Sequence, residues 1–366
     1  MEQFDVVVVG AGPGGSLAAR AAAEEGARTL VVDRRAELGE PVQCGEFVPT
    51  PEELVDIFHA PELIREAFQI PPATILRETH WMACISPSGH RFRFPLSGYM
   101  VSRRAFDKAL AYAAEGAGAE LRHPAGVVRV DGDLVGMANG TTIRAKVIVG
   151  ADGPTSIVAR SVGFAPPREM FRMITATVDG ASGDEIDVYF GRSAPGGYAW
   201  SFPRFTDANV GLGVTELPSG TSLSSLLDRF LEREDLGEAR DRTRWWVPIG
   251  PPPETLVFGR ALFCGDAANL VMATNGGGIP TAMLSGWLAG TAAARHVRSG
   301  VALSSYDRAW QAALETPLAR AHRIKKTTDR IVHSDLALTL GMRYIGVSGL
   351  DAMMRLRWPR RLGRAS

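Results

Sequence analysis

Hydrophobic residues follow three different patterns along this chain, and each pattern predicts a different kind of element. The run Phe4–Val9 is continuously apolar and rich in β-branched residues, which is typical of a strand buried on both faces of a parallel sheet. An alanine-rich helix is expected over Ser16–Glu25, with Gly26 as its stop, and a second strand over Arg28–Asp33. Together these segments predict one βαβ unit.

Further segments extend this first pattern. A helix is expected over Arg103–Glu115, and short apolar strands over Ile148–Gly150 and Ala261–Cys264 each run into an Asp-Gly or Gly-Asp pair. A last helix is expected over Thr281–His296, because Pro280 is a favoured residue at a helix start.

Other segments alternate between apolar and polar residues, as strands of an antiparallel sheet do. Thr79–Phe94 predicts a hairpin around a Pro-Ser-Gly turn. Further strands are expected over Phe171–Val178, Ile186–Phe190, Gly197–Pro203 and Asn209–Val214, followed by a helical stripe of Leu223, Leu226, Leu227, Phe230 and Leu231.

The fold class is therefore α/β: a Rossmann-like nucleotide-binding domain interleaved with an α+β domain built on an antiparallel sheet. We expect the nucleotide-binding domain to comprise residues 1–70, 98–168 and 255–300. The antiparallel-sheet substrate domain is expected over 71–97 and 169–254, and a C-terminal helical segment over 301–366.

Composition narrows the class of function. The 366 residues include 40 Lys and Arg against 40 Asp and Glu, so no overall charge favours nucleic acid. The N-terminus lacks the features of a secretory signal, so Cys44, Cys84 and Cys264 are expected to be free thiols in the cytoplasm. No metal-ligand spacing occurs. The uncharged stretch 267–294 is interrupted by glycines and a proline, which argues against a membrane span.

A glycine-rich turn follows the first strand directly. It reads Gly10-Ala11-Gly12-Pro13-Gly14-Gly15 and opens the first helix. Gly10 permits the tight turn, Gly12 lets the backbone approach a pyrophosphate, and Gly15 lets the helix pack closely on the strand. Asp33, with Arg34 beside it, ends the second strand at the distance expected of a carboxylate that binds ribose hydroxyls. This combination predicts a dinucleotide.

Two later pairs, Asp152-Gly153 and Gly265-Asp266, occur in an order that resembles the FAD-dependent family with the para-hydroxybenzoate hydroxylase fold. The resemblance implies FAD as the cofactor, with Asp266 at the ribityl–pyrophosphate junction and Asp152 supporting the site. It also matches Arg103 to a flavin-facing arginine, for which a solvated arginine at a helix start is the alternative.

A second glycine loop contains Gly277, Gly278 and Ile279, just before the helix expected after Pro280. Its N–H groups and the positive end of the helix could stabilise the anionic reduced flavin. A glycine-rich turn without a ligand is the alternative.

Two further motifs resemble the geranylgeranyl reductase branch of this fold. One is the loop Cys44-Gly45-Glu46, and the other is the strand Tyr198-x-Trp200-x-Phe202-Pro203, followed by Val210-Gly211. Alternate residues of a strand share a face, so the three aromatic rings would form a wall. The alternative is a sheet face packed on the core of its own domain. The resemblance implies saturation of C=C bonds in isoprenoid chains, such as archaeal lipids or prenyl tails.

The chemistry of an isolated alkene fits these residues. Reduction needs a hydride, which reduced flavin N5 can deliver, and a proton, which Cys44 could deliver. Glu46 would keep the thiol protonated, and the faces of Tyr198 and Trp200 could stabilise positive charge. A buried structural thiol is the alternative for Cys44. Cys44 and Gly45 are also placed at the flavin by the resemblance.

Other functions and partners stay open at this stage. A monooxygenase acting through a C4a-hydroperoxyflavin is the main alternative, and a non-enzymatic electron relay is another. The external electron donor could be ferredoxin, NAD(P)H or a reduced quinone. Residues 355–366 carry five arginines and no acid, so the chain end could touch the inner face of a membrane. A packed helix with a solvated tail is the plainer explanation, and the oligomeric state is not predicted.

Overall fold

The first strand lies inside a largely parallel sheet, as its apolar sequence predicts. The computed structural model describes residues 1–166, 169–180 and 183–362. β1 pairs in parallel with β2 and β9, and residues 6–9 are buried. The sheet has the order β15-β16-β9-β1-β2-β6. Its strands are β1 (Glu2–Val9), β2 (Thr29–Val32), β6 (Glu120–Arg122), β9 (Thr142–Gly150), β15 (Val257–Phe258) and β16 (Ala261–Phe263).

Helices α1 (Pro13–Glu24) and α7 (Ile279–Ser299) pack unusually close together beside this sheet. A Cβ atom at Gly290 would lie 2.0 Å from the carbonyl oxygen of Ala18. One at Gly286 would lie 2.0 Å from the carbonyl oxygen of Gly14. The glycines of α7 therefore allow its backbone to contact α1. Helix α1 begins at Pro13 rather than at Ser16, because the glycine-rich turn ends one residue earlier, at Gly12.

Several elements of this part of the molecule complete the nucleotide-binding domain. Helix α4 (Arg103–Gly116) occupies the predicted position and packs on α1, and α5 (Ile157–Val162) follows β9. The sequence patterns did not predict the hairpin of β7 (Val127–Asp131) and β8 (Leu134–Met137), which extends β9 through an antiparallel pair.

The second sheet is mixed rather than wholly antiparallel. Its order is β14-β10-β13-β12-β11-β4-β5-β3, and β11 runs parallel to β4. These two strands are separated along the chain by the middle segment of the first domain, so no hairpin fixes their relative direction. The strands are β3 (Phe47–Pro49), β4 (Ile75–Ile85), β5 (Arg91–Val101), β10 (Met170–Asp179), β11 (Glu185–Phe190), β12 (Tyr198–Pro203), β13 (Asp207–Val214) and β14 (Arg240–Pro248).

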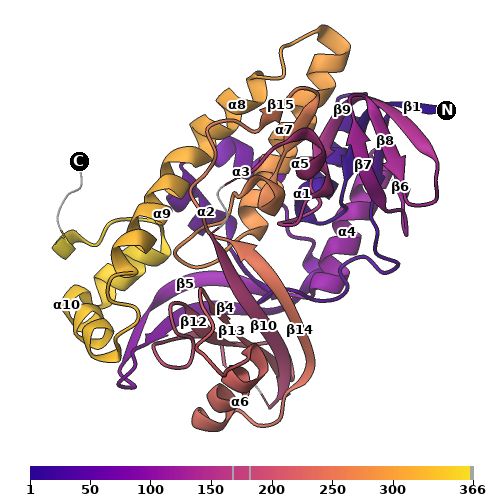
Figure 1. The fold of residues 1–366 in the computed structure, drawn as a ribbon. Coiled ribbons are helices and arrows are strands. Elements are labelled where there is room, and N and C mark those ends of the chain that lie inside the picture. Colours follow the sequence, from indigo (N-terminus) through magenta and orange to yellow (C-terminus); the bar gives the residue numbers. More distant parts are fainter. Residues whose placement is uncertain (167–168, 181–182, 363–366) are drawn as a thin grey trace.

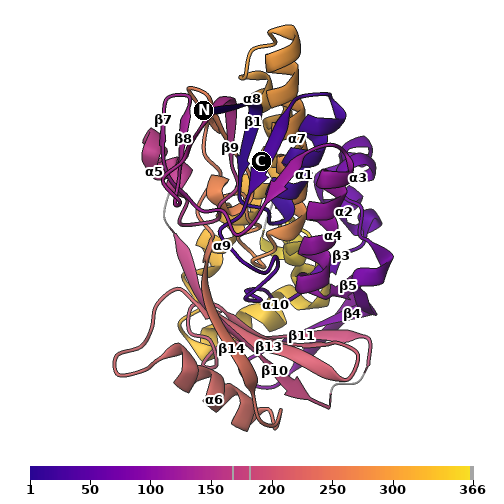
Figure 2. The ribbon, with the colours of Figure 1, turned by 90° about the vertical axis from the view of Figure 1, so that its right-hand side faces the viewer.

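The two faces of the second sheet have different neighbours. Helix α6 (Leu223–Arg233) covers one face, and its predicted apolar stripe packs on alternate residues such as Ala199, Val210 and Leu212. The nucleotide-binding domain lies on the other side (Figures 1 and 2). The side chains of residues 198, 200 and 202 project from this second face.

The proposed domain division needs adjustment at one boundary if the sheets define the domains. β3 lies within the expected first segment of the nucleotide-binding domain, yet it pairs with β5 in the second sheet. β5 itself continues to Val101, past the expected boundary at residue 97. The two domains are interleaved along the chain, and the exact residues at which they divide remain our proposal.

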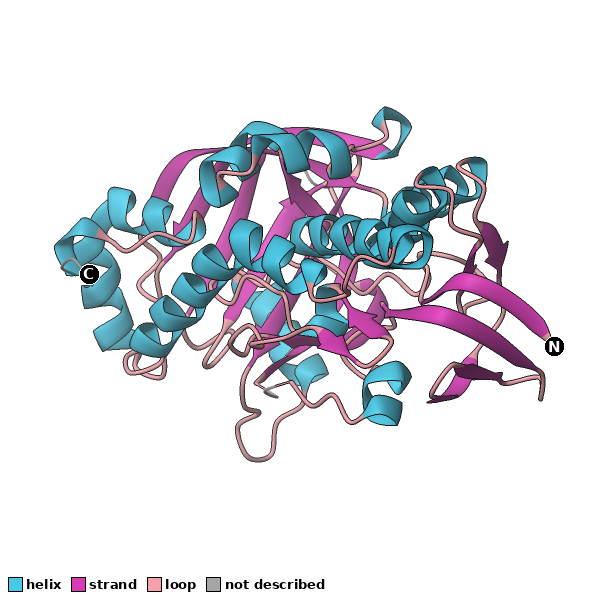
Figure 3. Cartoon of the chain, turned by 90° about the horizontal axis from the view of Figure 1, so that it is seen from above, coloured by secondary structure: helices cyan, strands magenta, loops and turns pink. Residues whose placement is uncertain are grey.

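The C-terminal helices run along one side of the molecule. Figure 3 shows helices at the end of the molecule opposite the N-terminus. Within the described part of the chain, no helix is long and apolar enough to span a bilayer. The helices that complete the fold are α2 (Pro51–Phe58), α3 (Pro61–Ala67), α8 (Ser305–Trp310), α9 (Thr316–Thr328) and α10 (Asp335–Met354), with a π-helical segment over Gln311–Glu315 and short 3₁₀ turns over Pro72–Thr74, Gly265–Ala268 and Arg360–Leu362.

Candidate active site

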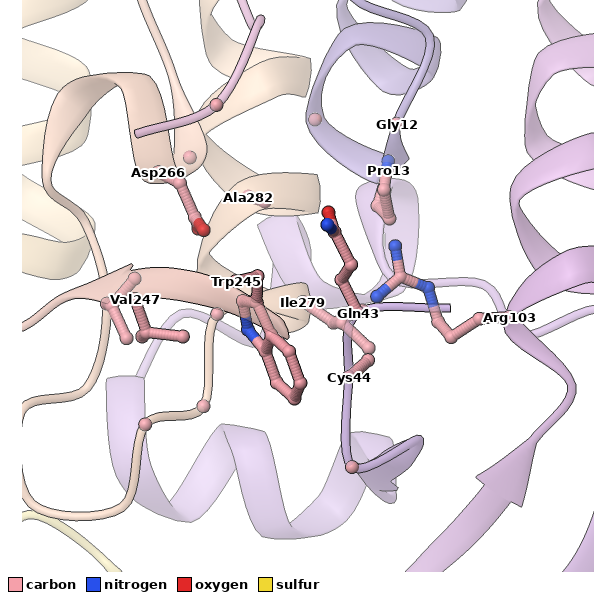
Figure 4. A pocket seen from close by; sticks show the side chains of 18 of the residues that line it. Gly12, Pro13, Gln43, Cys44, Arg103, Trp245, Val247, Asp266, Ile279 and Ala282 are labelled. Carbon is pink, nitrogen blue, oxygen red and sulfur yellow. The ribbon is translucent and has the colours of Figure 1, made fainter. Parts of the chain in front are cut away.

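A cavity of about 510 Å³ lies between the two sheets. Its upper wall is formed where β1, β9 and β16 end, which is where open α/β sheets bind nucleotides. The opposite wall comes from the second sheet, including Met173 of β10, Val188 of β11 and Trp245 of β14. Figure 4 shows the Asp266 side chain pointing into the space that Pro13, Cys44 and Arg103 border. The volume is within the range of small-molecule sites.

The glycine-rich turn has the geometry of a dinucleotide cradle. Gly10 has a φ of +101°, and a Cβ atom there would lie 2.4 Å from the carbonyl oxygen of Ala151. A Cβ atom at Gly15 would lie 1.7 Å from the carbonyl oxygen of Gly10. Nothing lies within 4 Å of the position of a Cβ atom at Gly12, so the turn is open on the side of the cavity. Pro13 and Gly14 begin α1 and line the same cavity.

Asp33 stabilises this turn while facing the cavity. Its carboxylate accepts hydrogen bonds from the backbone N–H groups of Ala11 and Arg35, both at 2.8 Å. A carboxylate has further lone pairs, so Asp33 can still accept from ribose hydroxyls. Arg34 is exposed and lines the cavity rim.

Two carboxyl groups follow β9 and β16 at the inner wall of the cavity. The Asp152 Oδ2 atom accepts from the N–H groups of Ile157 and Val158 at 2.6 and 3.3 Å. The Oδ1 atom is buried and has no hydrogen-bond partner among the described residues. Burial raises the pKa of Asp152, and it raises the pKa of Asp266 to about 6. An unpartnered buried acceptor indicates a ligand that donates hydrogen bonds, and the donor groups of FAD fit this requirement.

The second glycine loop is held by the opposite domain. The Tyr198 hydroxyl donates to the carbonyl oxygen of Asn275 at 2.6 Å, and the Asn275 side chain accepts from the N–H of Gly277 at 2.9 Å. The Gly277 N–H is therefore engaged by the protein, whereas Gly278 and Ile279 line the cavity where α7 begins. The phenol is committed to this contact rather than to proton transfer.

The loop of residues 44–46 lies over the aromatic wall. The Cys44 thiol accepts a hydrogen bond from the N–H of Glu46 at 3.2 Å. Burial is the main cause of its raised pKa, opposed by the nearby Arg103 charge. Glu46 acts in the expected direction but is the weakest of these influences, and its carboxylate is paired with Arg204 at 2.7 Å. Glu46 therefore holds the loop in place more than it tunes the thiol.

Arg103 is held beneath the cavity by a partner that sequence reasoning missed. Its guanidinium donates two hydrogen bonds to the buried Asp107 carboxylate, at 2.8 and 2.9 Å. The side chain is largely buried and lines the cavity. The alternative of a solvated arginine is therefore wrong. The spacing of four residues on the predicted helix was the available signal for this pair.

The aromatic residues of β12 form one wall of the cavity. The ring centroids of Tyr198 and Trp200 lie 6.0 Å apart, and those of Trp200 and Phe202 lie 6.1 Å apart. Trp245 of β14 meets Trp200 edge-on at 6.3 Å. The core under α6 packs on the other face of the sheet, so these rings face the cavity and not the core beneath α6.

The fold and this cavity define an FAD-dependent oxidoreductase. The family described as FAD dependent oxidoreductase matches residues 5–45, and the family described as geranylgeranyl reductase catalytic domain matches residues 169–244. The chain is 34% identical to the digeranylgeranylglycerophospholipid reductase of Methanocaldococcus jannaschii, over 84% of this chain and 82% of that protein. The chain therefore belongs to the digeranylgeranylglycerophospholipid reductase family.

Solved structures agree on the architecture. A geranylgeranyl bacteriochlorophyll reductase-like protein from Thermoplasma acidophilum is 27% identical and superposes with a TM-score of 0.80, over 93% of this chain and 96% of that one. The p-nitrophenol 4-monooxygenase of Pseudomonas putida is 17% identical with a TM-score of 0.68, over 98% and 99% of the two chains. The second likeness shows the fold alone.

Proposed function

We propose that this protein reduces C=C double bonds in isoprenoid chains, as in geranylgeranyl lipids. The observation that carries the proposal is the Cys44 thiol, placed between an FAD cradle and an aromatic wall in one cavity. A prenyl chain requires an apolar wall, and the second sheet provides one. The apolar residues of this wall include Met82, Leu96, Met173, Val188, Phe190, Trp200, Phe202, Trp245 and Val247.

Saturation of an isolated alkene adds a hydride to one carbon and a proton to the other. FAD, when bound and reduced, supplies the hydride equivalent. The raised pKa of Cys44 keeps its thiol protonated at neutral pH, so the S–H can supply the proton and become a thiolate. The positive charge of Arg103 favours that thiolate until solvent reprotonates it. The faces of Trp200 and Tyr198 stabilise positive charge that develops on the substrate.

Anaerobic mixing separates this reaction from oxygenation. The holoprotein is reduced chemically, freed of reductant and mixed with a geranylgeranyl phospholipid, and the absorbance of oxidised flavin is followed. A reductase lets the alkene reoxidise the flavin without oxygen. A monooxygenase leaves the flavin reduced until oxygen is admitted, which would overturn the proposal. Either ferredoxin, NAD(P)H or a reduced quinone then serves as the external donor in repeated turnover.

We also propose that the protein takes its substrate from an anionic lipid surface through α10. Three exposed side chains lie at helical spacing on the part of this helix before the kink at Gly346: Leu336 (71%), Leu340 (56%) and Tyr344 (58%). Val347 (44%) is exposed just beyond the kink. Arg343 is exposed among them, and the Tyr344 hydroxyl donates to the carbonyl oxygen of Arg361. An apolar stripe flanked by arginines complements an anionic membrane surface.

The basic chain end contributes less to this surface than its sequence suggests. Arg355 pairs with Glu53 at 2.7 Å, and Arg357 pairs with Asp56. Two of the five arginines are therefore engaged within the fold. Arg360 and Arg361 are exposed, and residues 363–366 lie outside the described part of the chain.

Vesicle flotation tests the membrane surface. The chain should float with vesicles that contain phosphatidylglycerol and bind those of pure phosphatidylcholine more weakly. Leu336→Glu with Leu340→Glu should abolish flotation, whereas Phe205→Glu, at an exposed aromatic in the turn after β12, should not. Equal flotation of both variants would contradict the assignment of α10.

A further inference from the structure

A single buried amide connects the two parts of the proposed site. Asn209 lies on β13 and is 2% exposed. Its neighbours Ala208 and Val210 project into the core beneath α6, so the Asn209 side chain projects to the cavity side of the sheet. There it lies between the indole of Trp200 and the loop that carries Cys44.

The contacts of Asn209 use every hydrogen-bonding position of its side chain. The Oδ1 atom accepts from Trp200 Nε1 at 2.8 Å and from the Thr175 hydroxyl at 2.9 Å. The Nδ2 atom donates to the carbonyl oxygen of Cys44 at 2.9 Å and to Glu46 Oε2 at 3.0 Å. An indole N–H only donates, and a carbonyl and a carboxylate only accept. Only an amide in this orientation satisfies all of these groups.

The loop is fixed on its other side by charge. Glu46 Oε2 also accepts from Arg204 at 2.7 Å, and Glu46 Oε1 accepts from the N–H of Arg103 at 3.1 Å. The Arg204 guanidinium in turn pairs with Asp207 at 2.8 Å. Because Glu46 is only 2% exposed, water does not compete for its carboxylate, and the ion pair and hydrogen bonds hold the loop in a single conformation.

Gly211 leaves room for the Trp200 indole that Asn209 holds. A Cβ atom on Gly211 would lie 2.3 Å from Trp200 Cζ2, so the indole lies directly across β13. A Cβ atom on Gly45 would lie 3.1 Å from the Phe202 ring, so the loop lies directly against the aromatic wall. The thiol loop, the indole and β13 thus form one closely packed unit.

We infer that Asn209 is a positioning residue that sets the thiol of Cys44 at a fixed place relative to the Trp200 face. This inference rests on the proposed function, in which the thiol and the indole act on the same substrate double bond. Without the amide, the Cys44 carbonyl, the Glu46 carboxylate and the Trp200 N–H each lose a buried partner. The loop then loosens, and the thiol becomes more accessible and more easily ionised.

Two variants and one control test the inference in the FAD-loaded protein. Asn209→Leu removes all four contacts at similar volume, and Asn209→Asp keeps the shape but replaces the amide donor with an acceptor. Thr175→Val removes one donor to the same oxygen and leaves the contacts to Trp200 and the loop. Alkylation of Cys44 by N-ethylmaleimide is followed by peptide mass spectrometry, beside turnover of a geranylgeranyl lipid.

Asn209→Leu should be alkylated about tenfold faster than the wild type, the gain expected when a thiol pKa falls by one unit. Asn209→Asp adds a carboxylate beside Glu46, which favours the protonated thiol, so this variant is judged by its turnover and not by its alkylation. The turnover of both Asn209 variants should fall at least tenfold, with bound flavin retained and Thr175→Val within twofold of the wild type. Asn209→Asp should regain turnover as the pH falls, because a protonated carboxyl can again donate to Glu46.

Turnover of Asn209→Asp within twofold of the wild type would overturn the inference, and so would unchanged alkylation of Asn209→Leu. If Asn209→Leu does not fold, the isosteric Asn209→Asp decides by its turnover. Failure of the proposed function is seen separately. In that case the wild type does not reduce the lipid, while the alkylation rates still show whether Asn209 positions the thiol.

Discussion

At the scale of single residues, the Cys44 thiol combines two properties that a proton donor to an alkene needs. It faces a cavity beside a cationic group, and burial keeps its pKa raised. Cys84 and Cys264 are also buried, and burial raises both of their pKa values to about 12. Cys84 is not among the residues that line the cavity. Cys264 lines it on the side of the FAD cradle, where a Cβ atom at Gly14 would lie 3.4 Å from its Sγ atom, and not beside the aromatic wall.

Replacing Cys44 with serine should separate proton transfer from cofactor chemistry. Because a hydroxyl is a far weaker acid, turnover should fall about a hundredfold or more, the contribution expected of a general acid. FAD content and its reduction by dithionite should not change. Cys84→Ala, away from the site, should keep its turnover per bound flavin. Full activity of Cys44→Ser would remove the thiol from the mechanism.

Asp266 makes the stability of the flavin-free protein dependent on pH. Burial raises its pKa from 3.8 to about 6, so its folded value lies above its unfolded value. Its stabilising contribution is complete below the unfolded value and is lost as the pH rises through the folded value. At about pH 8 the ionised group costs about 3 kcal/mol, at 1.36 kcal/mol per pKa unit.

Asp266→Asn should therefore be more stable than the wild type in flavin-free protein at about pH 8, with the difference vanishing near pH 4. Urea unfolding at several pH values measures this difference. A difference that does not change with pH would show that Asp266 is not the group that titrates.

Residue-level prediction from sequence reached furthest where a motif is local. The glycines at positions 10 and 15 lie within one turn, and their spacing indicated the tight turn and the close helix packing that the structure shows. The approach of Gly12 to a pyrophosphate stays a prediction. Asn209 could not be found in this way, because its partners Cys44 and Glu46 lie 165 and 163 positions away. Its role also depends on which face of β13 is turned to the cavity, and only the packed fold defines that face.

At the scale of elements, β13 illustrates how small residues shape the site. Gly211 and Gly213 project to the cavity side of the same strand, but their surroundings differ. A Cβ atom at Gly211 would meet the Trp200 ring at 2.3 Å and the carbonyl oxygen of Ile174 at 2.4 Å. A Cβ atom at Gly213 would meet only the flexible side chain of Met173, at 2.0 Å.

Gly211→Ala should therefore lower the free energy of unfolding by about 1–3 kcal/mol and impair turnover, since the indole must move. Gly213→Ala is the matched control, with a smaller loss because the methionine can change rotamer. Thermal unfolding and turnover of both variants measure this contrast. Equal losses at the two positions would show that the space for Trp200 is not what the glycine provides.

Elements with a strong hydrophobic periodicity were predicted from the sequence, and elements with a weak periodicity were missed. The buried strand β1 and the amphipathic helix α6 were evident because burial leaves a clear pattern in their sequences. The hairpin of β7 and β8 was missed because its strands are only five and four residues long and an exposed apolar residue, Val128, breaks the alternation. The Gly286 and Gly290 pair, four residues apart, was a readable signal of the close contact between α7 and α1.

At the scale of the whole molecule, the site exists only because two domains are interleaved. The FAD cradle comes from the ends of β1, β9 and β16, while the aromatic wall comes from the second sheet. Sequence patterns indicated both domains and their alternation along the chain. They did not indicate the parallel pairing of β11 with β4 or the contact of Tyr198 with the second glycine loop, because both join segments far apart in the chain.

The mass of the lipid product tests the central claim most directly. FAD-loaded protein, reduced without oxygen, is incubated with a geranylgeranyl phospholipid, and the extracted lipid is analysed by mass spectrometry. The proposed reaction adds two hydrogen atoms for each double bond, with one bond saturated per reduced flavin. A lipid of unchanged mass, or one that gains oxygen when air is admitted, would contradict the account.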